Sequence, residues 1–208
     1  MRVVADPESS SDLREIELRR HLQMMARYVE RAKAGSCLTM ILRSAGSDPA
    51  KALIGMKGAL QRAGVRAKVI LARLDAEEEL RQLFASLSEL APLSPAPELI
   101  RWARDPRLLE AHEQVIYGDC TCWSGDAMRR DADRRNVLTL FDEEAPNRAR
   151  LGRLAFTAMW AASTFVPERH LTGALTGRPS GAYEQIAEAP VSVSPSAPGP
   201  QGWPLVRH

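Results

Sequence analysis

The chain has 208 residues, of which 45% are hydrophobic and 26% are charged, a composition typical of a soluble globular protein. No apolar run approaches the roughly 18 residues that a membrane span needs, so a transmembrane protein is not expected. The 28 basic and 26 acidic residues give a formal net charge of +2, which is too small to indicate nucleic-acid binding by itself. Because the N-terminus lacks an apolar signal segment, we expect a cytoplasmic protein.

The first predicted element is a long helix that follows a disordered leader over residues 1–11. Asp12 and Glu15 have the spacing of a capping box, and apolar residues recur every three or four positions beyond Leu18. The helix is expected to run to about Ala34. We interpret its apolar stripe as the side that faces the core, with a dimer seam as the alternative.

A β-α-β unit is predicted next. Residues 37–42 form a short apolar run bounded by turn residues, which indicates a buried strand. Pro49 opens a helix that Gly64 ends. Residues 65–72 begin with alternating character and end fully apolar, as does a parallel strand that is covered on both faces.

The middle of the chain is expected to contain a helix, a connector and a β-hairpin. The helix covers residues 75–90, the proline-rich connector covers 92–97, and a short helical segment covers 99–103. Residues 108–123 have the pattern of two strands joined by a turn at Gly118-Asp119.

The last predicted elements are a polar loop over residues 124–136, a short strand over 137–141 and a helix that Pro146 starts. The compact body is expected to span residues 12–166. The proline, serine and glycine content of residues 167–208 predicts a mostly disordered tail. Its apolar residues Trp203 and Leu205 make it a candidate segment for binding a protein partner, although an isolated tryptophan in such a tail more often has no role.

The hairpin carries the residues that indicate chemistry. His112, Glu113 and Gln114 are followed by four residues and then by Asp119. Side chains alternate along a strand, so His112 and Gln114 share one surface. A carboxylate near a histidine fixes the tautomer of the ring, and we expect Asp119 to do so here. The alternative is that His112 is a hydrogen-bonded structural residue.

The spacing of these residues resembles the histidine-x-lysine-x4-aspartate motif of the phospholipase D-like superfamily. The resemblance covers roughly residues 12–165 and includes the order of elements, with a strand, a helix and the strand AGVRAKVILA before the motif. It implies an α/β fold with a mixed sheet and helices on both faces. In family enzymes one histidine attacks phosphorus, a second histidine protonates the leaving group, and lysines hold the phosphoryl oxygens.

Carried over residue by residue, the resemblance implies catalytic roles and phosphate contacts near the hairpin. The implied catalytic residues are His112 and Asp119, and the implied phosphate-binding residues are Gln114, Ser124, Arg129 and Arg130. For Arg129 and Arg130 a solvated surface loop is the alternative interpretation.

Several departures from the family pattern weaken the expected chemistry. Gln114 removes the positive charge of the lysine, a loss that typically costs about 10²-fold or more in rate. Asp126 and Met128 replace the serine and asparagine of the family's glycine-serine-x-asparagine turn, and Asp126 adds a negative charge where phosphate would sit. We therefore expect a degenerate site that binds a phosphate-containing ligand, such as nucleic acid or a phospholipid head group, with weak or no hydrolysis.

Two alternatives stay open. One is an active homodimeric phosphodiesterase, nuclease or phospholipase, in which two copies of His112 face each other and an arginine replaces the lysine. The other is a non-catalytic regulatory or scaffold protein that presents the tail or the first helix to partners.

The three cysteines do not indicate a metal centre or a disulfide framework. Cys120 and Cys122 lie two positions apart, but a structural zinc site needs a second close pair of ligands, and Cys37 is the one remaining cysteine. We expect reduced structural thiols, no bound metal and no cofactor.

Overall fold

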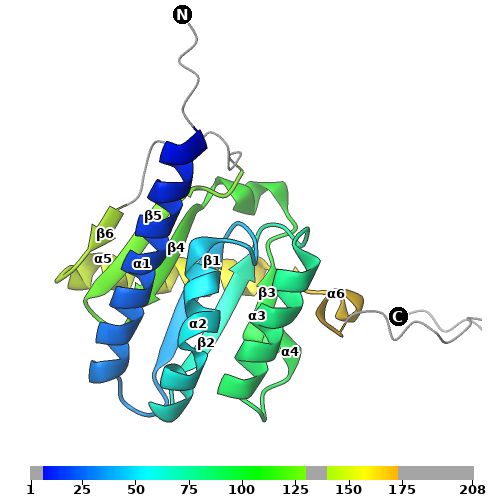
Figure 1. Cartoon of the computed structure of the whole chain (residues 1–208). Helices are drawn as coiled ribbons and strands as arrows, with labels where there is room; N and C mark the ends of the chain where they lie inside the picture. Colours follow the sequence, from blue (N-terminus) through cyan, green and yellow to red (C-terminus); the bar gives the residue numbers. More distant parts are fainter. Residues whose placement is uncertain (1–6, 130–139, 173–208) are drawn as a thin grey trace, which may run out of the picture. The chain divides into compact units, whose positions relative to one another are not determined.

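The computed structural model describes residues 7–129 and 140–172, with side chains described from residue 15 onward. This part of the chain has an α/β fold with one seven-stranded mixed sheet (Figure 1). The strand order is β6-β5-β4-β1-β2-β3-β7. Helices cover both faces of this sheet, as expected, with α1, α2 and α3 on one side and α5 on the other.

The N-terminal part of the sheet is the predicted β-α-β unit. Helix α1 (Pro7–Arg31) precedes β1 (Cys37–Leu42), α2 (Asp48–Arg62) and β2 (Arg66–Leu71). Strands β1 and β2 are parallel, with Cys37 opposite Arg66. Helix α1 begins earlier than expected, so residues 7–11 of the predicted leader are helical, while residues 1–6 lie outside the described residues.

The segment after the proline-rich connector differs from the prediction. Helix α3 (Glu77–Leu90) is followed by α4 (Ala96–Leu99) and then by strand β3 (Ile100–Trp102), where a helix was expected. Strand β3 pairs in parallel with β2. The open edge of β2 supplies hydrogen-bond partners that the predicted five-residue helix over 99–103 would lack, and this pairing overrides the local preference.

The predicted hairpin is confirmed. A short 3-10 helix, η1 (Pro106–Glu110), leads into β4 (His112–Tyr117), which pairs antiparallel with β5 (Thr121–Ala127). Gly118 turns the chain with φ of 82°, in the left-handed region that favours glycine. Strand β5 runs to Ala127, so its second half replaces the start of the loop expected from residue 124.

The C-terminal elements extend the body beyond its predicted end. Strand β6 (Leu140–Asp142) forms one edge of the sheet, and Pro146 starts α5 (Pro146–Ala162), as predicted. Strand β7 (Thr164–Phe165) pairs with β3 and forms the other edge. Helix α6 (Glu168–Thr172) follows and buries Leu171 in the core. Residues 168–172, which were predicted to belong to the tail, are therefore helical, and residues 173–208 lie outside the described part.

Alternation along the strands divides the core between the two faces of the sheet. Leu38, Met40 and Val69 belong to the large cluster under α1, α2 and α3. Ile41 and Ile70 point to the other side. There they pack with a smaller cluster that includes Phe156 and Met159 of α5. Within the described residues, none of the helices has both the length and the apolar character to cross a membrane.

Candidate functional site

The site lies at the end of the sheet where the parallel strands finish. We call this end the His112 edge, as distinct from the outermost strands β6 and β7. The parallel strands β1, β2 and β3 all end at this edge, and the antiparallel strand β4 starts there with His112. Ligands of open α/β sheets bind beyond the carboxyl ends of the parallel strands, where side chains from several strands meet. The topology thus places His112 where such a fold carries its chemistry.

The ring of His112 is held in one orientation by the backbone of β5. Nδ1 lies 2.8 Å from the carbonyl oxygen of Gly125, and the residue is exposed to solvent. A carbonyl oxygen can only accept a hydrogen bond, so Nδ1 carries the proton in the neutral ring. The lone pair then lies on Nε2, which is the atom available to a ligand or an electrophile.

A β-bulge creates this contact. His112 is opposite Ala127 and Gln114 is opposite Ser124, so a step of two residues on β4 faces three on β5. Gly125 is needed in the bulge, because a Cβ there would lie 2.7 Å from Cη2 of Trp123.

Asp119 is not the partner of His112, and this expectation is wrong. The two residues lie at opposite ends of β4, roughly 20 Å apart at about 3.3 Å per residue. The exposed carboxylate of Asp119 instead accepts a hydrogen bond of 3.0 Å from Nη1 of Arg153 on α5. The Gly125 carbonyl, and not Asp119, therefore orients the ring of His112.

Gln114 and Ser124 lie on the sheet face that α5 covers. The amide Nε2 of Gln114 donates to the Gly152 carbonyl on α5 over 3.0 Å. Ser124 is half-buried and pairs with Gln114 across the hairpin. Gln114, the residue that the resemblance aligns with a lysine, thus packs α5 onto the sheet.

Arg129 does come to the edge that carries His112. The backbone N–H of Arg129 donates to Leu109, and its guanidinium forms an exposed ion pair of 3.0 Å with Glu110. Arg130 lies outside the described residues. Of the six predicted site residues, the structure therefore places His112 and Arg129 at this edge, with Gln114 and Ser124 further along the hairpin under α5.

A buried ion pair behind His112 was missed by the sequence analysis. Glu113 accepts the backbone N–H of Arg43 over 2.9 Å, and its other oxygen lies 3.1 Å from Nη2 of the same residue. Nη2 also donates to the carbonyl of Ala127, the residue opposite His112. The pair joins the ends of β1, β4 and β5 next to His112 in the sequence and in the sheet.

Arginines in the sequence mark this end of the sheet. An arginine follows each parallel strand by one or two positions: Arg43 after β1, Arg73 after β2 and Arg104 after β3. Because parallel strands end on one side of a sheet, such arginines meet there. The pattern is visible only when the strand ends are known.

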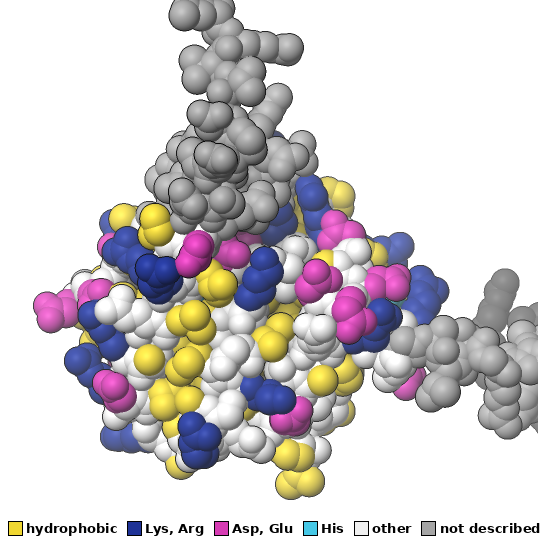
Figure 2. Space-filling view, in the orientation of Figure 1, with side chains coloured by type: hydrophobic (Ala, Val, Ile, Leu, Met, Phe, Trp, Pro, Cys, Tyr) yellow, Lys and Arg dark blue, Asp and Glu magenta, His cyan; other side chains and the backbone are white. Residues whose placement is uncertain are grey.

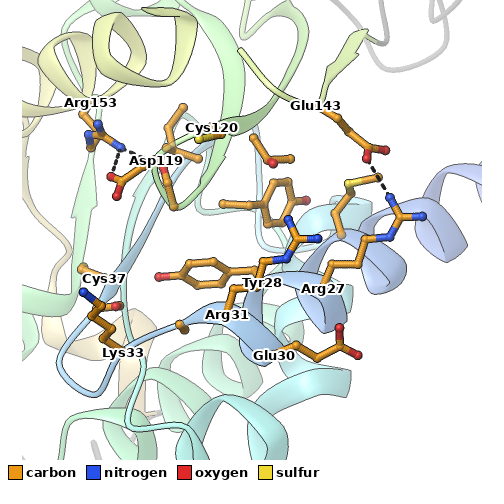
Figure 3. A pocket seen from close by; sticks show the side chains of 17 residues that line it. Arg27, Tyr28, Glu30, Arg31, Lys33, Cys37, Asp119, Cys120, Glu143 and Arg153 are labelled. Carbon is orange, nitrogen blue, oxygen red and sulfur yellow. Dashed lines mark hydrogen bonds and ion pairs between the residues drawn. The ribbon is translucent and has the colours of Figure 1, made fainter. Parts of the chain in front are cut away.

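A pocket of about 720 Å³ lies at the other end of β4 (Figure 3). The C-terminal end of α1, the turn between β4 and β5, and Arg153 of α5 line it. Two ion pairs lie among the residues that line it: Arg153 with Asp119, and Arg27 with Glu143. His112 does not line this pocket, which is therefore separate from the histidine edge.

The thiols near this pocket are free. Cys37 is half-buried and Cys120 is exposed, whereas Cys122 is buried in the sheet. Burial raises the pKa of Cys37 and of Cys122, so both remain protonated at neutral pH. Among the described residues, no three histidine, cysteine or acidic side chains are grouped so that they could hold a metal ion.

A comparison with protein-family models finds no match to this chain, and a comparison with curated proteins finds none either. The functional interpretation consequently depends on the residues and geometry described above.

Proposed function

We propose that the chain is a phospholipase D-like domain protein whose degenerate phosphodiester site binds a phosphate-containing ligand at the His112 edge. The observation that carries this proposal is the contact from Nδ1 of His112 to the Gly125 carbonyl. It leaves Nε2 of an exposed ring as the free nitrogen. That nitrogen accepts a hydrogen bond from a monoprotonated phosphate, and in the charged ring its N–H donates to a phosphodiester, which has no proton of its own to give.

Arg129 supplies the positive charge for the ligand. Its ion pair with Glu110 is exposed on both sides, and such surface pairs stabilise by at most about 1 kcal/mol. A phosphate can therefore take the place of Glu110 at little cost, and a guanidinium binds phosphate oxygens in a two-pronged geometry.

Hydrolysis is expected to be weak or absent. The residue at the position of the family's lysine, Gln114, is neutral, and its amide is held by Gly152. The transition state of phosphoryl transfer then lacks one fixed cation, a type of loss that costs about 10²-fold or more. With a single motif in the chain, a second histidine would also have to come from a second copy, which makes the active homodimer the alternative.

The test uses bis(p-nitrophenyl) phosphate, a phosphodiester whose cleavage releases a coloured product. The proposal predicts saturable binding, measured by calorimetry, with little or no colour release. His112→Ala should abolish binding without lowering the melting temperature, and His170→Ala on α6 is the matched control that should bind normally. Unchanged binding by His112→Ala would exclude the proposal. Rapid cleavage that depends on His112 would instead support the active phosphodiesterase.

A further inference from the structure

The outer side of helix α5 is apolar although it faces solvent. Leu151 and Leu154 are 58% and 59% exposed, and Phe165 just beyond the helix is 62% exposed. Helical periodicity places the two leucines among further exposed apolar side chains, namely Ala155, Ala158, Ala161 and Ala162. Single exposed leucines are ordinary, but a contiguous apolar strip marks an interaction surface.

The charges on this helix all have one sign. Helix α5 contains Arg148, Arg150 and Arg153 and no acidic residue. Arg148 forms an ion pair with Asp142 of β6, and Arg153 forms one with Asp119 in the turn between β4 and β5. Arg150 is exposed and forms no ion pair with the described residues.

The sheet beside α5 adds further cations. Lys68 of β2 lies 5.1 Å from the ring of Trp160 on α5, and Arg101 of β3 lies 4.9 Å from the same ring. Strands β1, β2 and β3 contain no acidic residue. The opposite face, over α1, α2 and α3, differs, because acidic and basic side chains are interspersed there (Figure 2). Asp142 and Asp119 balance Arg148 and Arg153, so the positive charge beside the apolar strip comes from Arg150, Lys68 and Arg101.

We propose that the α5 face, defined here by Leu151, Leu154, Arg150 and Phe165, docks on the surface of an anionic lipid bilayer. The leucines and Phe165 would enter the boundary between head groups and acyl chains, while the arginines meet the lipid phosphates. Long arginine side chains can keep the guanidinium among head groups while their stems lie along apolar surface. This docking does not depend on phosphate binding at His112.

Other occupants explain fewer of these observations. A second copy of the chain would bring two arginine-bearing, acid-free helices together, so that like charges repel across the interface. Nucleic acid would attract the arginines but would gain nothing from exposed leucines and a phenylalanine, because phosphates and base edges are polar. An anionic bilayer satisfies both the charge and the apolar strip.

The test is sedimentation of the full chain with vesicles of phosphatidylcholine alone and with vesicles that also contain phosphatidylglycerol. We expect binding only to the anionic vesicles, with an affinity that falls as salt is added. Leu151→Ser combined with Leu154→Ser should weaken binding about tenfold or more, since two apolar side chains no longer insert. Arg150→Glu should also weaken it. Because these side chains are largely exposed, the melting temperature should stay unchanged.

Matched controls come from exposed residues on other elements. Leu93→Ser, at the fully exposed residue between α3 and α4, and Arg62→Glu on α2 should leave vesicle binding unaltered. The proposal is overturned if the wild-type chain does not bind anionic vesicles, or if controls and α5 variants lose binding equally. A dimer in analytical ultracentrifugation that the leucine variant dissociates, without vesicle binding, would assign the face to a second copy and also overturn it.

Discussion

Glu113→Ala is expected to lower the free energy of unfolding by about 3–5 kcal/mol, because it leaves the charge of Arg43 buried without its counter-ion. The side chains of Arg43 and Glu113 are only 4% and 7% exposed. Removing the carboxylate also takes away the oxygen that accepts the backbone N–H of Arg43 over 2.9 Å, and this lost hydrogen bond accounts for about 1 kcal/mol of the expected change.

The double replacement Arg43→Met with Glu113→Leu separates the cost of an isolated charge from the value of the pair. Apolar residues of similar volume avoid the buried charge, so the double variant should lie within about 1–2 kcal/mol of the wild type. Glu143→Ala is the surface control. Its pair with Arg27 is half-exposed on both sides and should contribute less than about 1 kcal/mol.

Urea unfolding at neutral pH measures these differences as shifts of the midpoint at constant slope. The explanation fails if Glu113→Ala loses less than about 1 kcal/mol, or if the double variant is no more stable than the single one. A small loss in Glu113→Ala would mean that water reaches the guanidinium of Arg43. A double variant as unstable as the single one would mean that the isolated charge is not the main cost of Glu113→Ala.

Two further predictions concern the packing of the helices on the sheet. Burial lowers the pKa of His21, whose Nδ1 lies 2.5 Å from the Tyr117 hydroxyl, so the folded chain binds this proton more weakly than the unfolded chain. The stabilisation by neutral His21 is fully present above about pH 6.5 and decreases as the pH falls through the lower folded-state pKa. In His21→Leu the melting temperature should therefore fall less between about pH 7 and pH 5 than it does in the wild type. An identical pH profile of the two proteins would contradict this assignment. Gly152→Ala should destabilise by about 1–3 kcal/mol, because the new Cβ would lie 2.5 Å from Ile116, whereas Gly55→Ala on α2 meets only an ordinary contact and should stabilise by about 0.5–1 kcal/mol. Equal effects of the two alanines in thermal melts would show that the contact at α5 relaxes freely.

The sequence predicts those parts of the fold whose signals are local. Pro49 and Gly64 bound a helix between two apolar runs, and this is enough for a β-α-β unit. The turn at Gly118 and the helix start at Pro146 are local signals as well. Strand β3 was missed because residues 100–102 become a strand only when the edge of β2 lies beside them.

The site was harder to predict because its contacts are not local. The spacing of His112 and Asp119 suggested a pair, but an extended strand carries them to opposite ends of β4. The partner of His112 is a carbonyl, which every residue has, and it comes within reach only through the bulge at Gly125. Likewise, Arg43 and Glu113 are 70 positions apart, and only the pairing of β1 with β4 brings them together.

The most direct test of the account is a long-range ¹H–¹⁵N spectrum of the histidine rings, recorded with and without inorganic phosphate. We predict that His112 has its proton on Nδ1 and that phosphate shifts the Nε2 signal saturably, while the half-buried His170 on α6 responds only weakly. The opposite tautomer at His112, or equal and unsaturable shifts at both rings, would contradict a phosphate site at this edge.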